Sequence, residues 1–305
     1  METCSAITPQ PGHNYVAFFL SFACNLSCDY CINLHDRGSR SMQARRRQMS
    51  PAQWVEAANR LVLRADLPLT LQGGEPTLHP GFYRFVNEVK PDLKMDLMTN
   101  LMFDVDRFIR EVPVWRFTRE APYAAIRVSY HPGQNDIDDL IRSTFKLQDA
   151  GFRIGLYGIE HPDQEMHRHI EEVQARCLGL GLDFRTKEFL GEHQGVMLGT
   201  FKYDGCVTGA EMKDCECRTT ELIVDPSGFV YRCHSDLYRG REPIAHILDP
   251  AFNEEWLDEF RPCSWYGDCN PCDVKVKTNR FQIFGHTSVE IRKVTEKTWL
   301  KTASQ

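Results

Sequence analysis

The chain of 305 residues contains no apolar run that approaches the ~18 residues needed by a membrane-spanning helix. Its start, Met1 to His13, lacks the basic segment, apolar stretch and cleavage site of a signal peptide. An excess of basic charge is also missing, because 36 lysines and arginines face 42 aspartates and glutamates, which gives a net charge of −6. We therefore expect a cytoplasmic protein that binds neither membranes nor nucleic acid.

Cysteine, in contrast, is abundant, with twelve residues. Cytosolic thiols are kept reduced, so clustered cysteines in such a protein indicate metal or redox chemistry rather than disulfides. Three of them lie close together near the N-terminus and seven fall between Cys206 and Cys272, whereas Cys4 and Cys177 stand alone. Two separate metal or redox sites are therefore expected.

Short apolar runs alternate with longer amphipathic stretches over the first two thirds of the chain. The expected strands are 15–22, 67–72, 94–99, 124–131, 152–159 and 182–190. Helices are expected near 51–62, 80–90, 104–112, 135–150 and 163–178. Six β-α repeats predict an α/β fold, a parallel sheet curled into a partial (β/α)6 barrel, with function at the C-terminal strand ends.

The pattern changes near residue 195. Thr220–Val224 and Phe229–Cys233 flank Asp225-Pro226-Ser227-Gly228, which predicts a β-hairpin within a small cysteine-rich extension. We expect an N-terminal tail at 1–14, the barrel at 15–195, the extension at 196–275 and a C-terminal tail at 276–305.

Directly after the first strand come Cys24, Cys28 and Cys31, separated by three and two residues. Such a loop can deliver three thiolates to a cubane cluster and leave one iron open, since fully ligated clusters usually take four cysteines. A zinc loop and a redox pair of Cys28 and Cys31 are the alternatives.

This C-x3-C-x2-C loop, with Tyr30 before its last cysteine, resembles the radical S-adenosylmethionine (SAM) superfamily. The resemblance implies a 4Fe–4S cluster whose open iron binds SAM. It also implies reductive cleavage of SAM to a 5′-deoxyadenosyl radical that abstracts hydrogen from the substrate, with electrons from a low-potential donor of the flavodoxin or ferredoxin type.

A second motif ends the second strand: Gly73-Gly74-Glu75, followed by Pro76. It matches the family motif that binds the methionine ammonium of SAM. On its own it is a glycine loop with an acidic helix start. Asn100, at the end of the third strand, and Ser129, which resembles a ribose-binding position, are further cofactor candidates, as is Tyr30. The resemblance covers roughly residues 15–275.

Cys217, Gly228 and Cys233 have the spacing of the SPASM and twitch extensions of this superfamily, in which a hairpin helps to ligate an auxiliary 4Fe–4S cluster. The resemblance implies Cys217, Cys233, Cys269 and Cys272 as its ligands, with Cys263, Cys215 and Cys206 as substitutes or as ligands of a second cluster. Four thiolates in two pairs suit structural zinc equally well.

Candidate substrate contacts lie at later strand ends. His131 and His161 each precede a proline, where a loop histidine before a helix is the alternative. Arg185 and Lys187 share one face of the sixth strand, which fits either a polar barrel lumen or a solvent-facing edge strand.

The family resemblance implies an enzyme that abstracts hydrogen from a substrate carbon, with net oxidation or C–C or C–S bond formation. The first strand begins near Tyr15, leaving no room for a leader-binding domain, which favours a small metabolite or a peptide presented by a separate partner. The alternatives are a peptide maturase acting with such a partner, a non-catalytic zinc or iron–sulfur protein, and a cysteine-pair oxidoreductase.

Overall fold

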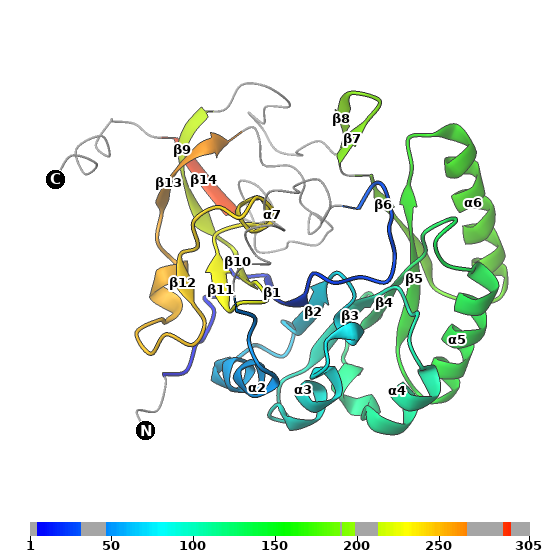
Figure 1. Cartoon of the computed structure of the whole chain (residues 1–305), viewed down its shortest axis with the longest axis horizontal. Helices are drawn as coiled ribbons and strands as arrows, with labels where there is room; N and C mark the ends of the chain where they lie inside the picture. Colours follow the sequence, from blue (N-terminus) through cyan, green and yellow to red (C-terminus); the bar gives the residue numbers. More distant parts are fainter. Residues whose placement is uncertain (1–4, 32–46, 190, 199–212, 267–288, 294–305) are drawn as a thin grey trace.

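The computed structural model describes residues 5–31, 47–189, 191–198, 213–266 and 289–293. Six strands follow the predicted order: β1 (Tyr15–Ser21), β2 (Leu69–Gly73), β3 (Met95–Thr99), β4 (Ile126–Ser129), β5 (Ile154–Glu160) and β6 (Phe184–Glu188). Five helices alternate with them: α2 (Pro51–Arg60), α3 (Phe82–Glu88), α4 (Val105–Glu111), α5 (Ile137–Asp149) and α6 (Gln164–Gly179). All six strands run parallel, and the helices line the outer side of the curved sheet (Figure 1).

Helix starts lie where the sequence provides capping side chains. Ser50 caps α2 in a capping box with Gln53, and Pro51 occupies the first turn. The carboxylates of Asp136 and Asp163 accept hydrogen bonds from the first turns of α5 and α6. These caps fix the points at which the chain leaves the functional end of the sheet.

Alternate side chains of β1 pack into two different layers. Phe18 points toward the helices, where its ring lies 5.0 Å from that of buried Trp54. Ala17 and Phe19 face the other side and pack with Ile223 and Tyr231 of the extension. The first strand is therefore covered on both faces, as expected for a central parallel strand.

The predicted hairpin is confirmed and continues the barrel sheet. β10 (Glu221–Val224) pairs antiparallel with β11 (Phe229–Tyr231), which pairs with β12 (Ala245–His246). On its other side β10 runs parallel to β1, with Tyr15 opposite Glu221 and Phe18 opposite Val224. The described residues thus form a nine-stranded sheet in the order β12-β11-β10-β1-β2-β3-β4-β5-β6.

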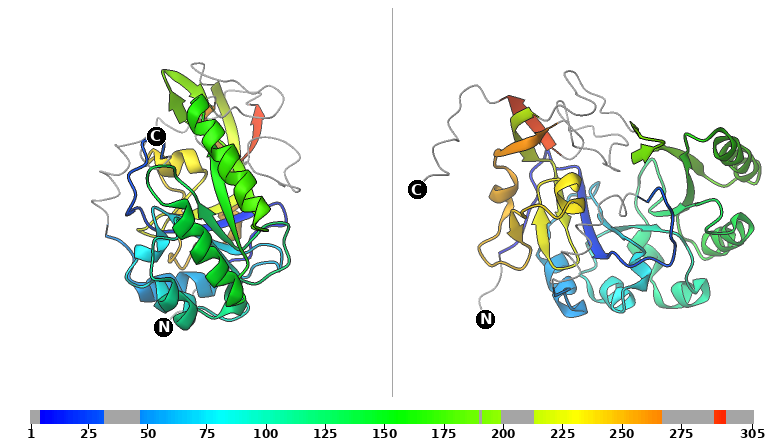
Figure 2. Two further views of the ribbon diagram at one scale, coloured as in Figure 1. Left: turned by 90° about the vertical axis from the view of Figure 1, so that its right-hand side faces the viewer. Right: turned by 45° about the horizontal axis from the view of Figure 1, so that its top comes forward.

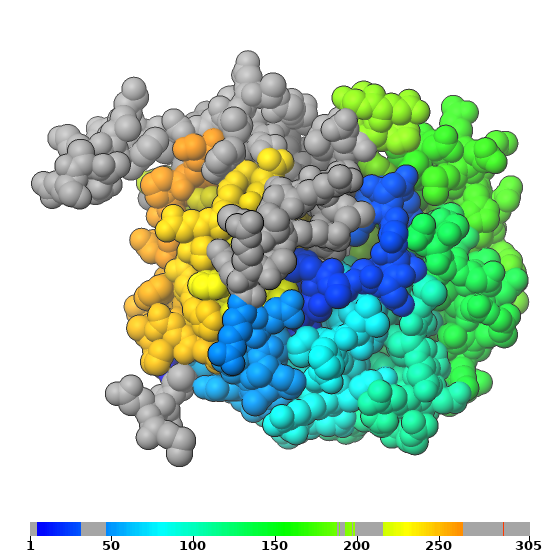
Figure 3. All heavy atoms as spheres, viewed as in Figure 1, coloured from blue at the N-terminus to red at the C-terminus, as the bar shows by residue number. Residues whose placement is uncertain are grey.

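This sheet curls without closing in the part of the chain that the structure describes, since β12 and β6 lie at its two ends (Figure 2). The expected partial barrel is confirmed. On the face shown in Figure 3, N-terminal residues (dark blue) lie between the C-terminal extension (yellow and orange) and the helical layer (green). No helix among the described residues is long and apolar enough to cross a bilayer.

Two smaller sheets accompany the large one. β9 (Lys213–Thr219) is the middle strand between β13 (Arg261–Tyr266) and β14 (Val289–Lys293). β7 (Gly191–His193) and β8 (Val196–Leu198) form a short hairpin after β6. The extension also contains the helix α7 (His234–Tyr238) directly after Cys233.

Buried Arg60, at the end of α2, joins the helical layer to the C-terminal extension. Its guanidinium donates to the main-chain oxygens of Ile247, Asp249 (3.0 Å) and Phe252 (2.8 Å). Carbonyl oxygens hidden from water need such donors, so Arg60 replaces solvent for this segment.

Candidate active site

The cysteine loop and the Gly73-Gly74-Glu75 loop are joined through their main chains. The N–H of Gly74 donates to the Ser21 oxygen at 2.8 Å, and the N–H of Glu75 donates to the Ala23 oxygen at 2.8 Å. The pairing of β1 with β2 thus continues past both strand ends. It places Cys24 beside the second motif.

The close approach of these loops explains both glycines. A Cβ atom on Gly74 would lie 2.2 Å from the Ala23 oxygen, and one on Gly73 would lie 2.1 Å from the Ser21 oxygen. Gly73 also has φ +134°, which side-chain-bearing residues rarely adopt. Gly73 approaches the end of β1 and Gly74 the residues that lead from β1 into the cysteine loop, a role that sequence reasoning missed.

The three N-terminal thiols differ in exposure: Cys24 is exposed, Cys31 is half-buried and Cys28 is buried. Burial, together with the nearby thiols of Cys31 and Cys24, raises the pKa of Cys28 to about 12. A thiolate at position 28 therefore needs a nearby positive charge, which ligated iron supplies. The donor set accordingly fits an iron–sulfur cluster.

Within the described residues, no three Cys, His, Asp or Glu side chains converge as they would around a single metal ion. A cubane binds each cysteine through a different iron, so its ligand thiols stand farther apart than those around one zinc ion.

Glu75 is fully buried and lies at the centre of a hydrogen-bond network. Its carboxylate accepts from the hydroxyls of Thr77 (2.6 Å) and Thr99 (2.9 and 3.0 Å) and from the Asn100 N–H (2.8 Å). Burial raises the pKa of Glu75, while these hydrogen bonds oppose the rise. The network fixes the ends of β2 and β3 relative to each other. The contact with the SAM ammonium stays a prediction.

Asn100 extends this network to the cysteine loop. Its Nδ2 donates to Asn25 Oδ1 at 2.7 Å and lies 3.8 Å from Cys24 Sγ, while its Oδ1 accepts from the Met102 N–H at 2.9 Å. The next residue, Leu101, has φ +59°, a strained conformation for a residue with a side chain. Three of the predicted cofactor residues, Gly74, Glu75 and Asn100, therefore lie around Cys24.

Asn135 is a polar residue of the site that sequence reasoning missed. Its Nδ2 donates to the Ser129 oxygen at 3.0 Å and to the Asn100 oxygen at 3.3 Å, and its Oδ1 accepts from the His131 N–H at 2.8 Å. It thereby links the ends of β3 and β4 and holds the main chain beside Ser129, the predicted ribose contact.

Tyr30 packs against the ends of the later strands. Its hydroxyl lies 3.1 Å from His131 Nδ1. Burial raises the pKa of Tyr30, whereas burial, helped by Lys187, lowers the pKa of His131 to about 4. Both groups are therefore neutral near pH 7 and share one hydrogen bond, whose direction depends on the tautomer of His131. The Tyr30 ring also packs against the rings of His161 and Phe189, with ring centres 5.6 and 6.2 Å apart.

The two basic candidates on β6 are placed differently. Arg185 donates to both carboxylate oxygens of Asp183 (2.9 and 3.2 Å) and to the Pro122 oxygen (2.7 Å). Lys187 lies 5.4 Å from the Tyr157 ring centre and acts electrostatically on His131. Among the described residues β6 is an edge strand of the sheet, and a substrate contact of Arg185 or Lys187 stays a prediction.

The structure brings three cysteines of the extension together. Cys217 on β9 and Cys263 on β13 are buried in one cluster, and Cys233 packs against it. All three thiols act electrostatically on Arg232. Cys215 pairs with Cys263 through the main chain. Cys206, Cys269 and Cys272 lie outside the described residues.

Comparisons with known proteins agree with this geometry. The family model described as Radical SAM superfamily matches residues 19–173, slightly more than half of the chain. Streptococcus suis SuiB bound to precursor peptide SuiA has a similar structure (TM-score 0.52, 12% identity), aligned over 84% of this chain and 65% of that one. Native anSMEcpe with bound AdoMet and Cp18Cys peptide is also similar (TM-score 0.51, 14% identity, 81% and 80% covered).

No curated protein sequence matches the chain. The structural likenesses, at such low identity, concern the fold alone. The family match covers the cysteine loop from Cys24 onward, the Gly73-Gly74-Glu75 motif and Asn100. The chain therefore belongs to the radical SAM superfamily, whose members use SAM and a 4Fe–4S cluster.

Proposed function

We propose that this protein is an enzyme that abstracts hydrogen from a carbon atom of a peptide, with net oxidation or formation of a C–C or C–S bond. The observation that carries the proposal is the main-chain and Asn100 linkage of the cysteine loop to Gly73-Gly74-Glu75. In this proposal Cys24, Cys28 and Cys31 hold the cluster. SAM lies against Gly73, Gly74, Glu75, Asn100 and Ser129, beside Tyr30.

The bound cluster and SAM supply an electron and a carbon radical, and the protein supplies position and exclusion of water. Tyr30 and His131 hold the cysteine loop against the ends of β4 to β6. Asn25 and Asn100 hold its other end. These contacts restrict the loop on both sides of Cys28, which is the preorganisation that a reactive intermediate requires.

We assign a second, auxiliary cluster to the extension. Cys217, Cys233 and Cys263 supply three ligands, and Cys269 or Cys272 supplies a fourth. The grouping of three thiols around Arg232 supports this assignment, since a guanidinium favours thiolates. A flavodoxin- or ferredoxin-type protein is the proposed electron donor.

The preference for a peptide over a small metabolite rests on the two similar structures. SuiB is described as bound to the precursor peptide SuiA, and anSMEcpe as bound to the Cp18Cys peptide. We further propose that a separate partner protein binds such a peptide and presents it to the enzyme.

The test uses the full chain, purified and reconstituted without oxygen. We expect about eight irons per chain, four for each cluster, and 5′-deoxyadenosine after dithionite and SAM are added. The Cys28→Ala variant should form none. Cys177→Ala, which removes a buried thiol on α6, is the matched control and should keep both properties. A colourless protein that binds zinc and leaves SAM intact would overturn the proposal in favour of a structural zinc protein.

A further inference from the structure

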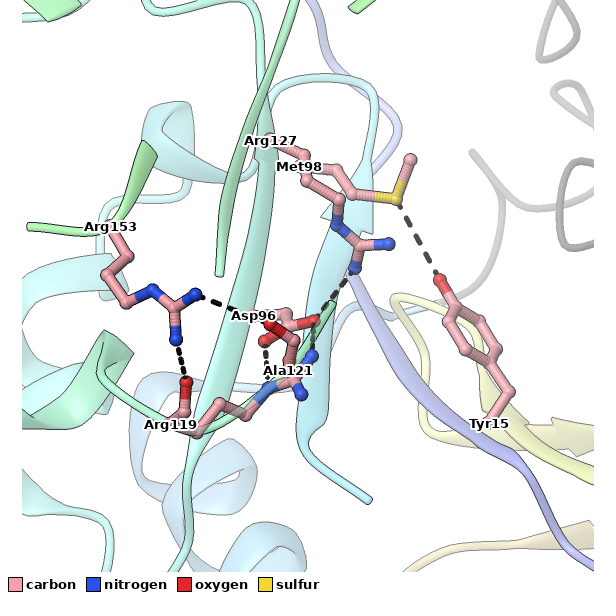
Figure 4. Close-up of polar contacts among 7 residues, drawn as sticks. All are labelled: Tyr15, Asp96, Met98, Arg119, Ala121, Arg127 and Arg153. Carbon is pink, nitrogen blue, oxygen red and sulfur yellow. Dashed lines mark hydrogen bonds and ion pairs between the residues drawn. The ribbon is translucent and has the colours of Figure 1, made fainter. Parts of the chain in front are cut away.

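A buried ion-pair network on the inner side of the sheet has one positive charge in excess. Arg119 donates to both oxygens of Asp96, at 2.8 and 2.7 Å, and Arg127 donates to the Oδ2 atom at 3.2 Å (Figure 4). The Asp96 side chain is fully buried, and those of Arg119 and Arg127 are 5% and 15% exposed. Among the described residues, Arg119 and Arg127 share Asp96 as their one ion-pair partner, so two positive charges face one negative charge.

Arg127 belongs to a layer of inward-facing residues at one level of the sheet. Its strand partners are Met98 on β3 and Gly155 on β5. The Tyr15 hydroxyl lies 3.8 Å from Met98 Sδ and donates to Gln72 Oε1 at 3.1 Å, which places Gln72 in the same neighbourhood. Gly155 carries no side chain, and the position of its missing Cβ lies 3.1 Å from Oδ2 of Asp183, a carboxylate that is already paired with Arg185.

Two donors of this layer find no acceptor in the part of the chain that the structure describes. Arg127 Nε and Gln72 Nε2 are both shielded from solvent, and neither has a hydrogen-bond partner among the described residues. Buried donors are nearly always satisfied, because leaving one unpaired costs the full loss of its hydration. Arg127 thus combines an unpaired nitrogen with a positive charge that Asp96 does not fully neutralise. An anionic acceptor from outside the chain would satisfy both.

We infer that this layer is a substrate subsite for a carboxylate, with Arg127 as its cationic residue and Gln72 as a neighbouring donor. The inference rests on the proposed function and narrows the substrate to a peptide with an acidic side chain or a free carboxyl terminus. Arg127 precedes Ser129 by two residues on β4, so it lies about 7 Å deeper than the predicted ribose contact. A planar guanidinium suits a carboxylate particularly well.

The probes are two capped tripeptides, acetyl-Ala-Glu-Ala-amide and acetyl-Ala-Gln-Ala-amide, which differ in a single charge. Binding to the SAM-loaded, reconstituted enzyme is measured by titration calorimetry. The wild type should bind the glutamate peptide about tenfold more tightly than the glutamine peptide. Arg127→Gln should abolish this preference, and Arg127→Lys should keep part of it.

Arg153→Gln is the matched control. Among the described residues, Arg153 donates to the main-chain oxygens of Arg119 and Ala121 alone, so its loss should leave the preference intact. Asp96 keeps both bonds to Arg119 in Arg127→Gln, and thermal unfolding checks that this variant folds.

Equal binding of the two peptides by the wild type, binding of neither, or an unchanged preference in Arg127→Gln would overturn the inference. Formation of 5′-deoxyadenosine by the wild type without any peptide is measured in parallel. An enzyme that cleaves SAM but shows no carboxylate preference loses only this inference, whereas an enzyme that does not cleave SAM loses the proposed function.

Discussion

The main-chain N–H of Asn100 donates to Oε2 of Glu75 at 2.8 Å, across the ends of two neighbouring strands. One carboxylate thereby fixes the start of η1 (Pro76–Leu78) and the end of β3, and through Asn100 it fixes the cysteine loop. The predicted SAM residues and the predicted cluster ligand Cys24 are thus parts of one hydrogen-bonded unit.

Glu75→Gln should destabilise the protein by about 1–3 kcal/mol. The amide NH2 of glutamine is a donor, and it would replace a carboxylate oxygen that now accepts hydrogen bonds from its neighbours. Urea unfolding of the full chain measures this loss. The control is Glu88→Gln, which breaks an ion pair with Arg84 whose two side chains are about half exposed, and it should change stability by about 0.5 kcal/mol or less. Equal losses in the two variants would contradict the central role of Glu75.

Gly74→Ala should displace the cysteine loop, since the new methyl group would meet the main-chain oxygen of Ala23 at 2.2 Å. We expect less iron after reconstitution and no 5′-deoxyadenosine, as judged by iron analysis and chromatography. Gly179→Ala makes the same change at the end of α6, where nothing lies within 4 Å. That variant should be as active as wild type and as stable or slightly more so. Full activity of Gly74→Ala would contradict the close packing of the two loops.

Acid should destabilise the fold through His131 and His13, because burial lowers the pKa of each from 6.5 to about 4. Between these values the unfolded state binds more protons, so stability is present above pH 6.5 and falls as the pH drops toward 4. Each histidine contributes up to about 3 kcal/mol of this loss. The slope of unfolding free energy against pH reports how many protons the chain takes up when it unfolds. In His131→Gln this number should fall by one, and in the double variant with His13→Gln it should fall by two. An unchanged slope would place both histidines in a solvent-like environment.

Cys263→Ala should lower the iron content by about four atoms per chain and leave cleavage of SAM intact, since Cys263 groups with Cys217 and Cys233. Iron analysis and 5′-deoxyadenosine formation are measured on the same sample. Cys177→Ala again controls for the loss of a buried thiol. Unchanged iron in Cys263→Ala would remove this residue from the ligand set and favour Cys269 and Cys272.

The sequence was sufficient to predict the repeating part of the fold. Strands such as β1 and β5 are short apolar runs, and capping residues such as Ser50, Asp136 and Asp163 mark helix starts, so local pattern determines these elements. The pairing of β10 with β1 could not be predicted, because it joins residues about 200 positions apart and neither strand carries a mark of its partner.

The candidate site was predictable where spacing carries chemistry, as in Cys24, Cys28, Cys31 and the Gly73-Gly74-Glu75 motif. Thr99 and Asn135 were missed because an ordinary polar residue shows its role only once its acceptors are known. The grouping of Cys263 with Cys217 also depends on strand pairing, since Arg261, two residues before Cys263 on β13, lies opposite Cys217 on β9.

The position of β10 next to β1 has a consequence for translation. The ribosome releases β1 early, yet its second neighbour consists of residues 221–224. At about 5–20 residues per second, the intervening stretch takes about 10–40 s to synthesise. Throughout that interval the nascent chain exposes an apolar strand edge that invites mispairing, and this strand leads directly into the cysteine loop.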